Sequence, residues 1–358
     1  MLFLIAPFMK PPVLKLILGT ALLSTCACAS GPVVALHRLE RPSCESGGPV
    51  EWFGPADPDQ RQRLSNWCES VGPAVVDAPA GVPANVDLSQ SGLTVVSWNV
   101  HEGGGDVERL LARLRNAPRT PPEAAPAVVM LVQEAMRGGA SVPSTFPAAV
   151  SPPGRIAPRR ARLADVVDVA RQMGLWIAYV PSMRNGRGGD GEDREDRGSA
   201  ILSTLPLSEA VAIELPWVHQ RRVAVMATVS SRVGSAPWRA RMVSVHLDNR
   251  PDRALQAASL ARFLRPYSAD SIPLVVGGDL NTWFGAREKT VGHLDAVIPR
   301  VKECGNRPTF QYGLHLDHVL TTLAPDVQRG CDILEDSFGS DHRPTVLRVL
   351  GRSDDPTF

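Results

Sequence analysis

The sequence predicts one layered domain of the α/β or α+β class that begins near Leu93. From Leu93 onward, short runs rich in β-branched residues alternate with stretches in which apolar residues recur at helical spacing. The chain has 358 residues, of which 44% are hydrophobic and 21% charged, and this composition is typical of a globular protein with a sizeable core. Disordered and fibrous chains are therefore excluded.

The first 29 residues are predicted to be a secretory signal peptide. Val13–Leu23 is apolar but too short to cross a bilayer as a stable helix, and Lys10 precedes it. Ala27–Ala29 fits the small-x-small rule for signal peptidase cleavage. We therefore expect a secreted or periplasmic protein. An imperfect lipoprotein box ends at Cys26, so a lipid anchor at that residue is the alternative.

Four cysteines remain after cleavage, and an even number is typical of an exported, disulfide-bonded protein. Because they fall into two local pairs, we expect bridges Cys44–Cys68 and Cys304–Cys331 among the three possible connectivities. There is no Cys-x-x-Cys motif, which disfavours a structural zinc site.

Residues 30–92 are predicted to be an N-terminal extension that is not an independent domain, since they are rich in Pro, Gly, Asp and Ser. The folded domain is expected to cover residues 93–350, and residues 351–358 to form a C-terminal tail. Gly186–Gly198 has a run of charges and no apolar anchor, so we predict a mobile surface loop there.

Within the domain, β-branched apolar runs predict strands and amphipathic stretches predict helices. The predicted strands are Leu93–Val100, Val128–Gln133, Trp176–Val180, Ala200–Ser203, Val223–Val229, Ala240–His246, Ile272–Val276, His318–Thr321 and Thr345–Val349. The predicted helices are Asp106–Asn116, Ala161–Met173 and Arg253–Tyr267; the last two carry Leu, Val and Ala at helical spacing.

Polar clusters follow several of these apolar runs. They are Ser97–Val100, Val132–Ala135, Ser244–Asn249, Gly277–Asn281 and Ser340–Pro344, and a sixth, Leu316–Leu320, places an acid where a strand begins. Side chains at strand ends of a layered domain converge on one face, where loops build sites on a rigid scaffold. Sets of Asp, Glu and Asn suit a hard cation such as Mg²⁺. The sequence lacks Cys ligand motifs and a His-x-x-x-His helix, which argues against a zinc protease.

Each cluster alone also has a purely structural interpretation. Asp279 and Asn281 could form a turn by bonding to their own backbone. Asn99 or Glu134 could cap a neighbouring helix, and His246 could be a core histidine with satisfied hydrogen bonds. The order of the clusters along the chain and their occurrence together therefore decide between the structural and the functional interpretation. The net charge of +1 argues against a strongly basic coat for nucleic acid but leaves a local basic site open.

From Val95 to about Val349 the chain resembles the endonuclease/exonuclease/phosphatase superfamily, which includes deoxyribonuclease I, sphingomyelinases and inositol polyphosphate 5-phosphatases. The motifs occur in family order: Trp98-Asn99, Gln133-Glu134, Arg-Gly-Ser-Ala-Ile-Leu-Ser at 197–203, Ser-Val-His-Leu at 244–247, Gly-Asp-Leu-Asn-Thr at 278–282, Leu-Asp-His-Val-Leu at 316–320 and Ser-Asp-His-Arg-Pro at 340–344. The resemblance implies a four-layer sandwich of two packed mixed β-sheets flanked by helices, with the site at one mouth.

The resemblance also implies a metal site. Glu134 would be the principal Mg²⁺ ligand, with Asn99 and Asp341 close to the metal or the phosphate. Mn²⁺ and Ca²⁺ are the alternative ions. A divalent cation at these residues would stabilise the negative charge that develops on phosphate oxygens during hydrolysis.

Five further residues receive catalytic roles by the same resemblance. Asp279 and Asn281 would orient the attacking water or the scissile phosphate. His342, partnered by Asp317, would handle the proton. His246 would contact the phosphoryl oxygens or assist the leaving group; a histidine at this position favours the deoxyribonuclease, sphingomyelinase or phosphatase branches over abasic-site nucleases.

These expectations together describe an exported, metal-dependent phosphodiesterase, with nuclease activity favoured. The alternatives are a sphingomyelinase-like or inositol-phosphate phosphatase-like hydrolase, and a catalytically silent binding protein on the same fold. The expected partner is a phosphoester substrate, either nucleic acid or a phospholipid or inositol phosphate. The sequence indicates no obligate protein partner, so we expect a monomer. Trp217 and Trp283-Phe284 are interpreted as core or rim packing.

Overall fold

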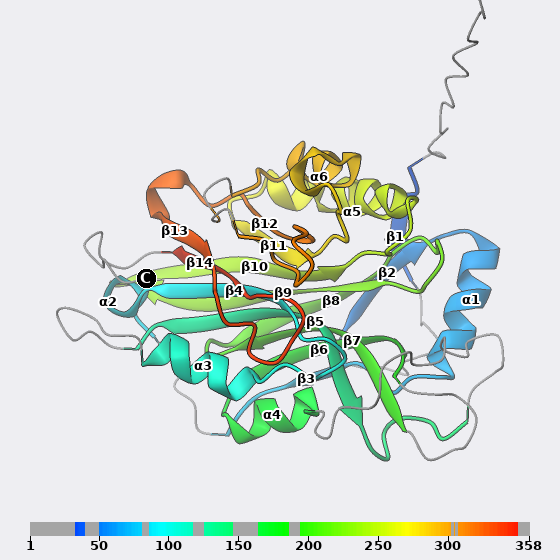
Figure 1. Ribbon diagram of the computed structural model, residues 1–358, viewed down its shortest axis with the longest axis horizontal. Coiled ribbons are helices and arrows are strands. Elements are labelled where there is room, and N and C mark those ends of the chain that lie inside the picture. The colour runs from blue at the N-terminus through cyan, green and yellow to red at the C-terminus, as the bar shows by residue number, and fades with distance from the viewer. Residues whose placement is uncertain are drawn as a thin grey trace, which may run out of the picture.

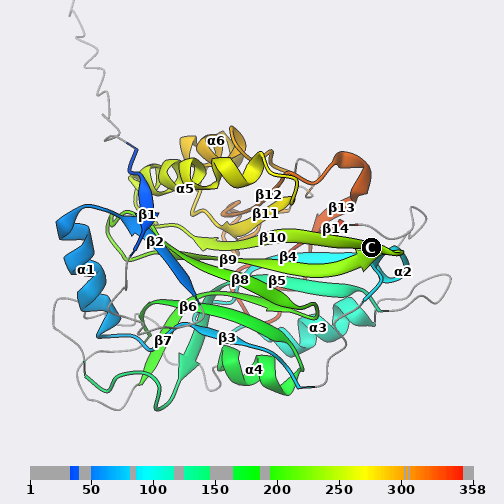
Figure 2. The same ribbon diagram turned by 180° about the vertical axis from the view of Figure 1, so that it is seen from behind.

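The computed structural model describes residues 33–39, 50–80, 86–116, 125–145, 164–185, 194–301, 304 and 307–349. In this part of the chain, two seven-stranded mixed sheets pack face to face and helices cover both outer faces (Figures 1 and 2). The predicted four-layer sandwich is confirmed. The expected signal segment and C-terminal tail lie outside these ranges. No helix within them combines the length and apolarity needed to span a membrane.

The first sheet has the strand order β1-β2-β8-β9-β10-β11-β12. The strands β2–β8 and β10–β11 pair in parallel, and the other neighbours are antiparallel. Their bounds are β1 Leu36–Arg38, β2 Glu51–Pro55, β8 Leu207–Glu214, β9 Val223–Val233, β10 Ala236–His246, β11 Leu274–Asp279 and β12 Asp317–Thr321.

The second sheet has the order β13-β14-β4-β5-β7-β6-β3, with β4–β5 as its parallel pair. Its strands are β3 Val75–Asp77, β4 Leu93–Asn99, β5 Ala127–Gly138, β6 Trp176–Arg184, β7 Glu195–Ser203, β13 Gln328–Ile333 and β14 Thr345–Val349. One apolar core lies between the sheets and includes Val95, Leu131, Val225 and Val275.

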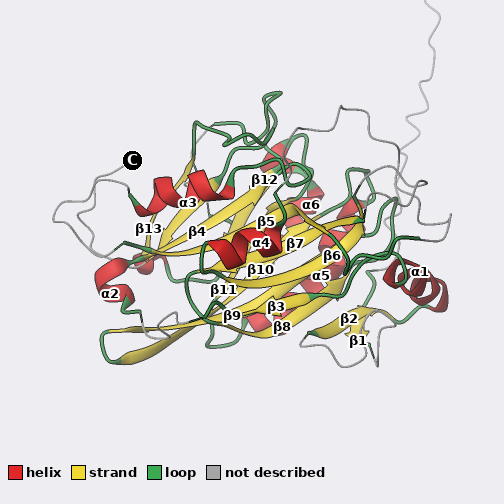
Figure 3. Cartoon of the chain, turned by 90° about the horizontal axis from the view of Figure 1, so that it is seen from below, coloured by secondary structure: helices red, strands yellow, loops and turns green. Residues whose placement is uncertain are grey.

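Four helices complete the two outer layers: α3 Val107–Arg115, α4 Val166–Gln172, α5 Arg253–Ser268 and α6 Lys289–Asp295. Helices α1 Pro58–Cys68 and α2 Leu88–Ser91 stand at opposite ends of the sandwich (Figure 1), and short 3₁₀ turns lie at Gly285–Arg287 and Pro325–Val327. Figure 3 shows α3 and α4 lying across the strands of the second sheet. The helices α5 and α6 pack on the first sheet. Each outer layer therefore has its own apolar core.

Helix α3 shows why the helical prediction succeeded. The Asp106 carboxylate accepts a hydrogen bond from the Arg109 N–H at 2.9 Å and caps the helix. Leu110, Leu111 and Leu114 are buried along one face. Capping and a continuous apolar stripe both act locally, so they can be read from the sequence. The predicted bounds differ from α3 only by the two capping residues.

Several predictions of element bounds were wrong. Helix α4 begins at Val166 rather than at Ala161, because the Asp165 carboxylate caps it by accepting the Val167 N–H at 2.8 Å. The predicted loop Gly186–Gly198 ends too late, since Glu195–Gly198 belong to β7 and Asp196 is fully buried. The remainder of that predicted loop, up to residue 193, lies outside the described residues.

The segment assigned to the N-terminal extension contributes to both sheets. Strands β1 and β2 continue the first sheet through the parallel pair β2–β8, and β3 pairs with β6 in the second sheet. Trp52 lies in the core between the sheets. The strands β8 and β13 were also not predicted from the sequence.

A glycine in β11 lets the two sheets approach each other near the site. A Cβ atom at Gly277 would lie 2.8 Å from the Ser97 Cβ of β4, which is closer than real Cβ contacts. The small residue therefore allows the end of β11 to meet the end of β4. Asp279 and Asn99 stand at those two strand ends and hydrogen-bond across the sheets at 3.0 Å.

A disulfide joins Cys304 to Cys331, as predicted. Cys68 is also disulfide-bonded, and its expected partner Cys44 lies outside the described residues. Replacing Cys304 and Cys331 together by serine is expected to lower the free energy of unfolding by about 3 kcal/mol, because the bridge closes a long loop in the unfolded chain. Urea denaturation followed by circular dichroism measures this loss. A double variant as stable as the wild type would contradict it.

Candidate active site

Seven of the eight predicted site residues line one cavity of about 300 Å³: Asn99, Glu134, His246, Asp279, Asn281, Asp341 and His342. They come from the ends of β4, β10 and β11, from β5, and from the loops that follow β11 and precede β14. The eighth, Asp317, begins β12 and contacts His342 from behind. The structure thus brings all eight together, although they are scattered along most of the domain.

Asp279 occupies the centre of this cluster. Its Oδ2 accepts a hydrogen bond from Asn99 Nδ2 at 3.0 Å and lies 3.4 Å from His246 Nε2 and 3.7 Å from His342 Nε2. Its Oδ1 accepts the Asn281 N–H at 2.8 Å. Burial raises the pKa of Asp279 to about 7, and the nearby Asp317 carboxylate acts in the same direction, while His342 opposes them. The Asp279 carboxylate thus lies between the imidazoles of His246 and His342.

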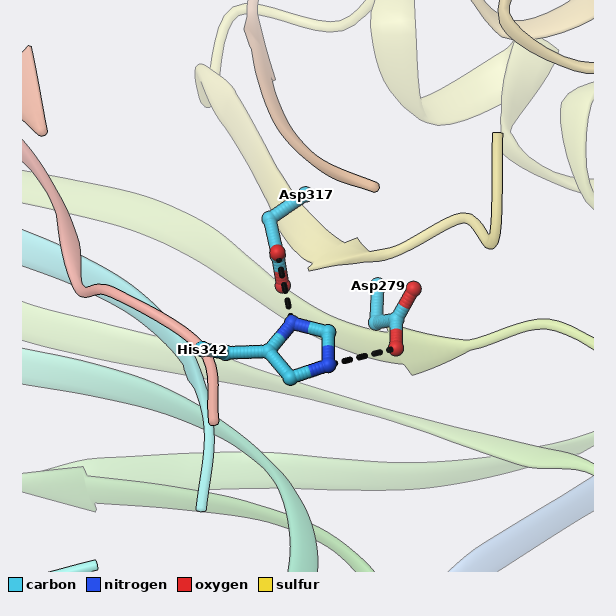
Figure 4. A group of neighbouring side chains, drawn as sticks. All are labelled: Asp279, Asp317 and His342. Atoms are coloured by element: carbon cyan, nitrogen blue, oxygen red, sulfur yellow. Dashed lines mark hydrogen bonds and ion pairs between the residues drawn. The ribbon is translucent and has the colours of Figure 1, made fainter. Parts of the chain in front are cut away.

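His342 and Asp317 form a buried ion pair. The Nδ1 of His342 donates to Asp317 Oδ2 at 2.8 Å, and its Nε2 faces Asp279 (Figure 4). Burial alone would lower the pKa of His342, but the Asp317 carboxylate outweighs it and raises that pKa to about 10. The imidazole is therefore held as a cation with an N–H group on each side, Nδ1–H toward Asp317 and Nε2–H toward Asp279.

The backbone around this pair is also fixed. Trp98 Nε1 donates to the His342 carbonyl oxygen at 3.0 Å. The Thr309 hydroxyl accepts the N–H groups of Leu316 and Asp317 at 2.9 and 3.1 Å. The Phe310 ring packs on His342 with centroids 4.8 Å apart. These contacts hold the pair in place before any substrate arrives.

Glu134 is aimed into the cavity by an irregularity in β5. The register between β5 and β7 shifts between Val132 and Ala135, and Glu134 itself has a φ of 53°. Bulges of this kind redirect a side chain next to active sites, and the left-handed conformation is strained for a non-glycine residue. Glu134 Oε2 accepts the Glu102 N–H at 3.0 Å and lies 3.9 Å from the Arg197 guanidinium.

Asp341 pairs with a histidine that the sequence analysis missed. Its Oδ2 lies 2.7 Å from His101 Nδ1. Burial acts to raise the pKa of Asp341, but the hydrogen bond and the charge of His101 outweigh it, so this pKa is lowered. His101 is itself positioned by Asn99, whose Oδ1 accepts the His101 N–H at 2.9 Å. Asp341 is thus held as a carboxylate on the cavity wall.

His246 has the opposite electrostatic environment. Burial and the neighbouring Arg222 guanidinium lower the pKa of His246 well below its usual range. Arg222 Nη1 lies 3.3 Å from His246 Nδ1, and a guanidinium can only donate, so Nδ1 accepts and the proton sits on Nε2. The cavity therefore combines a neutral imidazole at His246 with a cationic one at His342.

The donor chemistry of this cavity fits a hard divalent cation. Glu134 and Asp341 present carboxylate oxygens to the same small space, and Asn99 adds an amide oxygen. Within the described part of the chain, Asp279, Asp317 and His342 also place ligand-type atoms within 4.8 Å of one another. In that trio, however, the His342 Nδ1 proton is already bonded to Asp317. The pair Asp317–His342 within the trio therefore also suits a proton relay.

Several residues on the cavity wall were not predicted as site residues. His101 and Glu102 follow the Trp-Asn motif and both have positive φ, at 50° and 56°. Arg197 opens the Arg-Gly-Ser-Ala motif and bonds to Glu102. Arg222 directly precedes β9 and is nine-tenths buried. An arginine next to a predicted buried strand was the available signal for Arg222; Arg197 lay in the segment interpreted as a loop.

Comparison with known proteins identifies the family. The model of the endonuclease/exonuclease/phosphatase family matches residues 96–342. No curated protein matches the chain. A solved endonuclease/exonuclease/phosphatase from Beutenbergia cavernae is 20% identical, with 74% of this chain and 73% of that chain covered and a TM-score of 0.50.

Two further similar structures are the human Nocturnin catalytic domain with bound sulfate and a 3′ phosphatase from Neisseria bound to a product DNA hairpin. The first is 17% identical over 74% of this chain and 95% of that chain, with a TM-score of 0.48. The second is 17% identical over 72% and 98%, with a TM-score of 0.43. The family match extends over more than half of the chain and includes every predicted site residue. The protein is therefore a member of the endonuclease/exonuclease/phosphatase family.

Proposed function

We propose that this protein is an exported, Mg²⁺-dependent phosphodiesterase that acts as a nuclease. Members of its family hydrolyse phosphate esters, which supports the reaction class. The disulfide between Cys304 and Cys331 supports export, because such bonds persist in oxidising compartments. The two arginines of the cavity, Arg197 and Arg222, support a phosphate ester as the substrate, since guanidinium groups match phosphate oxygens.

One observation carries the proposal: carboxylates and imidazoles converge on one cavity. Glu134, Asp279 and Asp341 repel one another without a cation, so their convergence costs stability unless it serves a ligand. The two imidazoles, His246 and His342, are held in different charge states on the same wall. A silent binding protein has no physical need for this arrangement.

The mechanism follows from the chemistry of each group. Glu134, Asn99 and Asp341 would hold the divalent ion, which when bound neutralises charge on a phosphate oxygen. Mn²⁺ and Ca²⁺ have the same preference for oxygen ligands. Phosphodiester hydrolysis builds negative charge on the nonbridging and leaving oxygens, so groups that meet this charge lower the barrier.

The remaining side chains act on the water and the phosphate. Asp279, fixed by Asn99 and by the Asn281 N–H, accepts the proton of the attacking water. His342, a cation whose Nδ1 is bonded to Asp317, transfers its Nε2 proton to the leaving oxygen. His246, which is neutral, donates a hydrogen bond from Nε2–H to a phosphoryl oxygen or to the leaving oxygen. Each group is in place before substrate binds, which is the main source of electrostatic catalysis.

An activity screen with and without metal tests the proposal. The purified mature protein is incubated with plasmid DNA, single-stranded DNA, sphingomyelin vesicles and phosphorylated inositols, in Mg²⁺ or in EDTA. We expect DNA cleavage in Mg²⁺ and none in EDTA. Glu134→Gln should lower the rate about 10²–10³-fold, because it removes the principal electrostatic ligand. Glu108→Gln, on the exposed surface of α3, is the matched control.

The outcomes separate the alternatives. Turnover of sphingomyelin or inositol phosphates without DNA cleavage would assign the enzyme to the lipid or phosphatase class. If no phosphoester is hydrolysed with Mg²⁺, Mn²⁺ or Ca²⁺ and Glu134→Gln raises the melting temperature, the cavity is a relic and the proposal is wrong.

A further inference from the structure

A second cavity, of about 470 Å³, lies directly beside the catalytic one. The segment His315–Asp317 separates them: Leu316 lines the catalytic cavity, whereas His315 and Asp317 line the second one. The paired side chains of Asp317 and His342 therefore lie between the second cavity and the position proposed for the scissile phosphate. Its volume lies in the range of small-ligand sites.

Cationic side chains dominate the polar lining of this second cavity. Arg287 and Arg300 line it, and the one acid among its described lining residues is Asp317, which is already paired with His342. Arg300 Nε is buried without a hydrogen-bond partner, and so is the hydroxyl of Thr345. In the described ranges, no carboxylate lies within 4.0 Å of the guanidinium of Arg287 or Arg300. Two guanidinium groups on the wall with no carboxylate paired to them in the described residues favour an anionic ligand.

Exposed aromatic side chains surround the same region. Phe284 is 81% exposed and lines the second cavity, and its neighbour Trp283 is 57% exposed. Tyr312 is 76% exposed, and its ring lies 5.3 Å from Phe310, which lines the catalytic cavity. Among large hydrophobic side chains in the described residues, Val33 is the one other exposed example. The interpretation of Trp283 and Phe284 as packed residues was therefore wrong.

The loops that carry these rings are held by hydrogen bonds. Thr282 Oγ1 donates to the His315 carbonyl oxygen at 2.9 Å, which ties the two loops together. The Phe284 N–H donates to Glu288 Oε1 at 2.8 Å. The Gln311 N–H donates to the Asp341 carbonyl oxygen at 3.0 Å, next to the catalytic histidine. The rings are thus presented to solvent on a fixed frame, which reduces the entropy cost of binding.

We propose that the second cavity is a nucleotide subsite that makes the enzyme prefer single-stranded nucleic acid. Arg287 and Arg300 would bind the phosphate next to the scissile one, and Phe284, with Trp283 and Tyr312, would stack on unpaired bases. This proposal rests on the nuclease function proposed above and deepens it.

The chemistry distinguishes this ligand from the other phosphoesters. Single-stranded nucleic acid combines a second phosphate with flat rings, and binding sites for it combine cationic grooves with aromatic platforms. Paired bases in a duplex are not free to stack on protein side chains. A membrane contact would need the rings on an apolar surface, whereas Phe284 shares its cavity with two guanidinium groups.

Binding measured in EDTA tests the subsite without any hydrolysis. Fluorescence anisotropy gives the Kd of a labelled oligothymidine and of an abasic strand of equal length. Phe284→Ala is expected to raise the Kd of oligothymidine about tenfold and that of the abasic strand less than twofold, because one stacking contact is lost. Phe284→Tyr should restore binding.

The double variant Arg287→Gln/Arg300→Gln is expected to raise the Kd of both strands at least tenfold. The slope of log Kd against log salt should fall by about 1.4, since two phosphate contacts are lost. Arg113→Gln, on exposed α3 in the opposite outer layer, is the matched control. In Mg²⁺, the ratio of kcat/KM for the oligonucleotide to that for bis(4-nitrophenyl) phosphate should fall at least tenfold in the double variant and stay constant in the control.

Three results would overturn the subsite. One is unchanged binding in these variants, and another is equal weakening of the thymidine and abasic strands by Phe284→Ala. The third is Phe284-dependent binding to phosphatidylcholine/phosphatidylserine vesicles with no binding to oligothymidine, which would identify a membrane contact. Because the anisotropy assay needs no turnover, an inactive protein that binds as described would refute only the proposed catalysis.

Discussion

Replacing Asp279 by asparagine is expected to lower kcat about 10²–10³-fold for the phosphoester that the enzyme hydrolyses. The carboxylate lies between His246 Nε2 and His342 Nε2 and accepts from Asn99, so it is the shared acceptor of the cavity. An amide keeps the shape but can neither accept the proton of the attacking water nor pair with His342. Steady-state kinetics at saturating metal and substrate measure the loss.

Two comparisons make this result specific. Asp279→Asn removes one of several clustered negative charges, so its melting temperature should equal or exceed that of the wild type. Asp317→Asn tests a positioning role: it should reduce kcat and also change the pH profile, because His342 loses its charged partner. Activity of Asp279→Asn within threefold of the wild type would refute the assignment of this residue.

The sequence predicted which residues converge on one cavity better than it predicted the bounds of the elements around them. Short motifs that follow one another in a fixed order along the chain contain Asn99, Glu134, Asp279 and His342. Such motifs can be recognised in the sequence without knowledge of the tertiary packing. Strands and helices with strong local signals, such as β4 and α3, were also found. The four-layer arrangement came from the resemblance, since periodicity alone does not tell which strands are neighbours.

The missed elements have weak local signals. Strand β8, Leu207–Glu214, mixes polar residues and alanine with only two β-branched residues, and it is a strand because β2 and β9 pair with it on both sides. Strand β13, Gln328–Ile333, contains a glycine and lies at the edge of its sheet, with β14 as its neighbouring strand. Tertiary pairing overrides propensity in such segments.

Charged residues that become buried were the other source of error. Asp196 was assigned to a solvated loop because its hydrogen-bond partners cannot be identified from the neighbouring sequence. In the structure it accepts from Arg137 Nε at 3.1 Å, from the Tyr179 hydroxyl at 2.7 Å and from the Gly72 N–H at 2.7 Å. Burial and the Asp196 charge raise the pKa of Tyr179 well above its usual value, so the phenol stays a neutral donor. These contacts are all long-range, which hides them from local pattern analysis.

Replacing Asp196 by alanine is therefore expected to lower the free energy of unfolding by about 3–5 kcal/mol. The substitution leaves the guanidinium of Arg137, which is 3% exposed, without its carboxylate, and an uncompensated buried charge is costly. Urea denaturation measures the change. Glu51→Ala, which breaks the exposed pair between Glu51 and Arg38, is the matched control and should cost less than about 1 kcal/mol.

The same network connects the N-terminal segment to the candidate active-site cavity, and this connection sets a second expectation for Asp196→Ala. Gly72 and Pro73 bond to Asp196 and Arg137, and the next residue of β7, Arg197, reaches Glu102 and Glu134 in the cavity. Loss of Asp196 frees the start of β7, so Arg197 should lose its fixed position and KM should rise with the loss of stability. A double replacement, Arg137→Met/Asp196→Leu, removes both charges and should recover most of the stability. If Asp196→Ala costs no more than Glu51→Ala, the network does not anchor the segment.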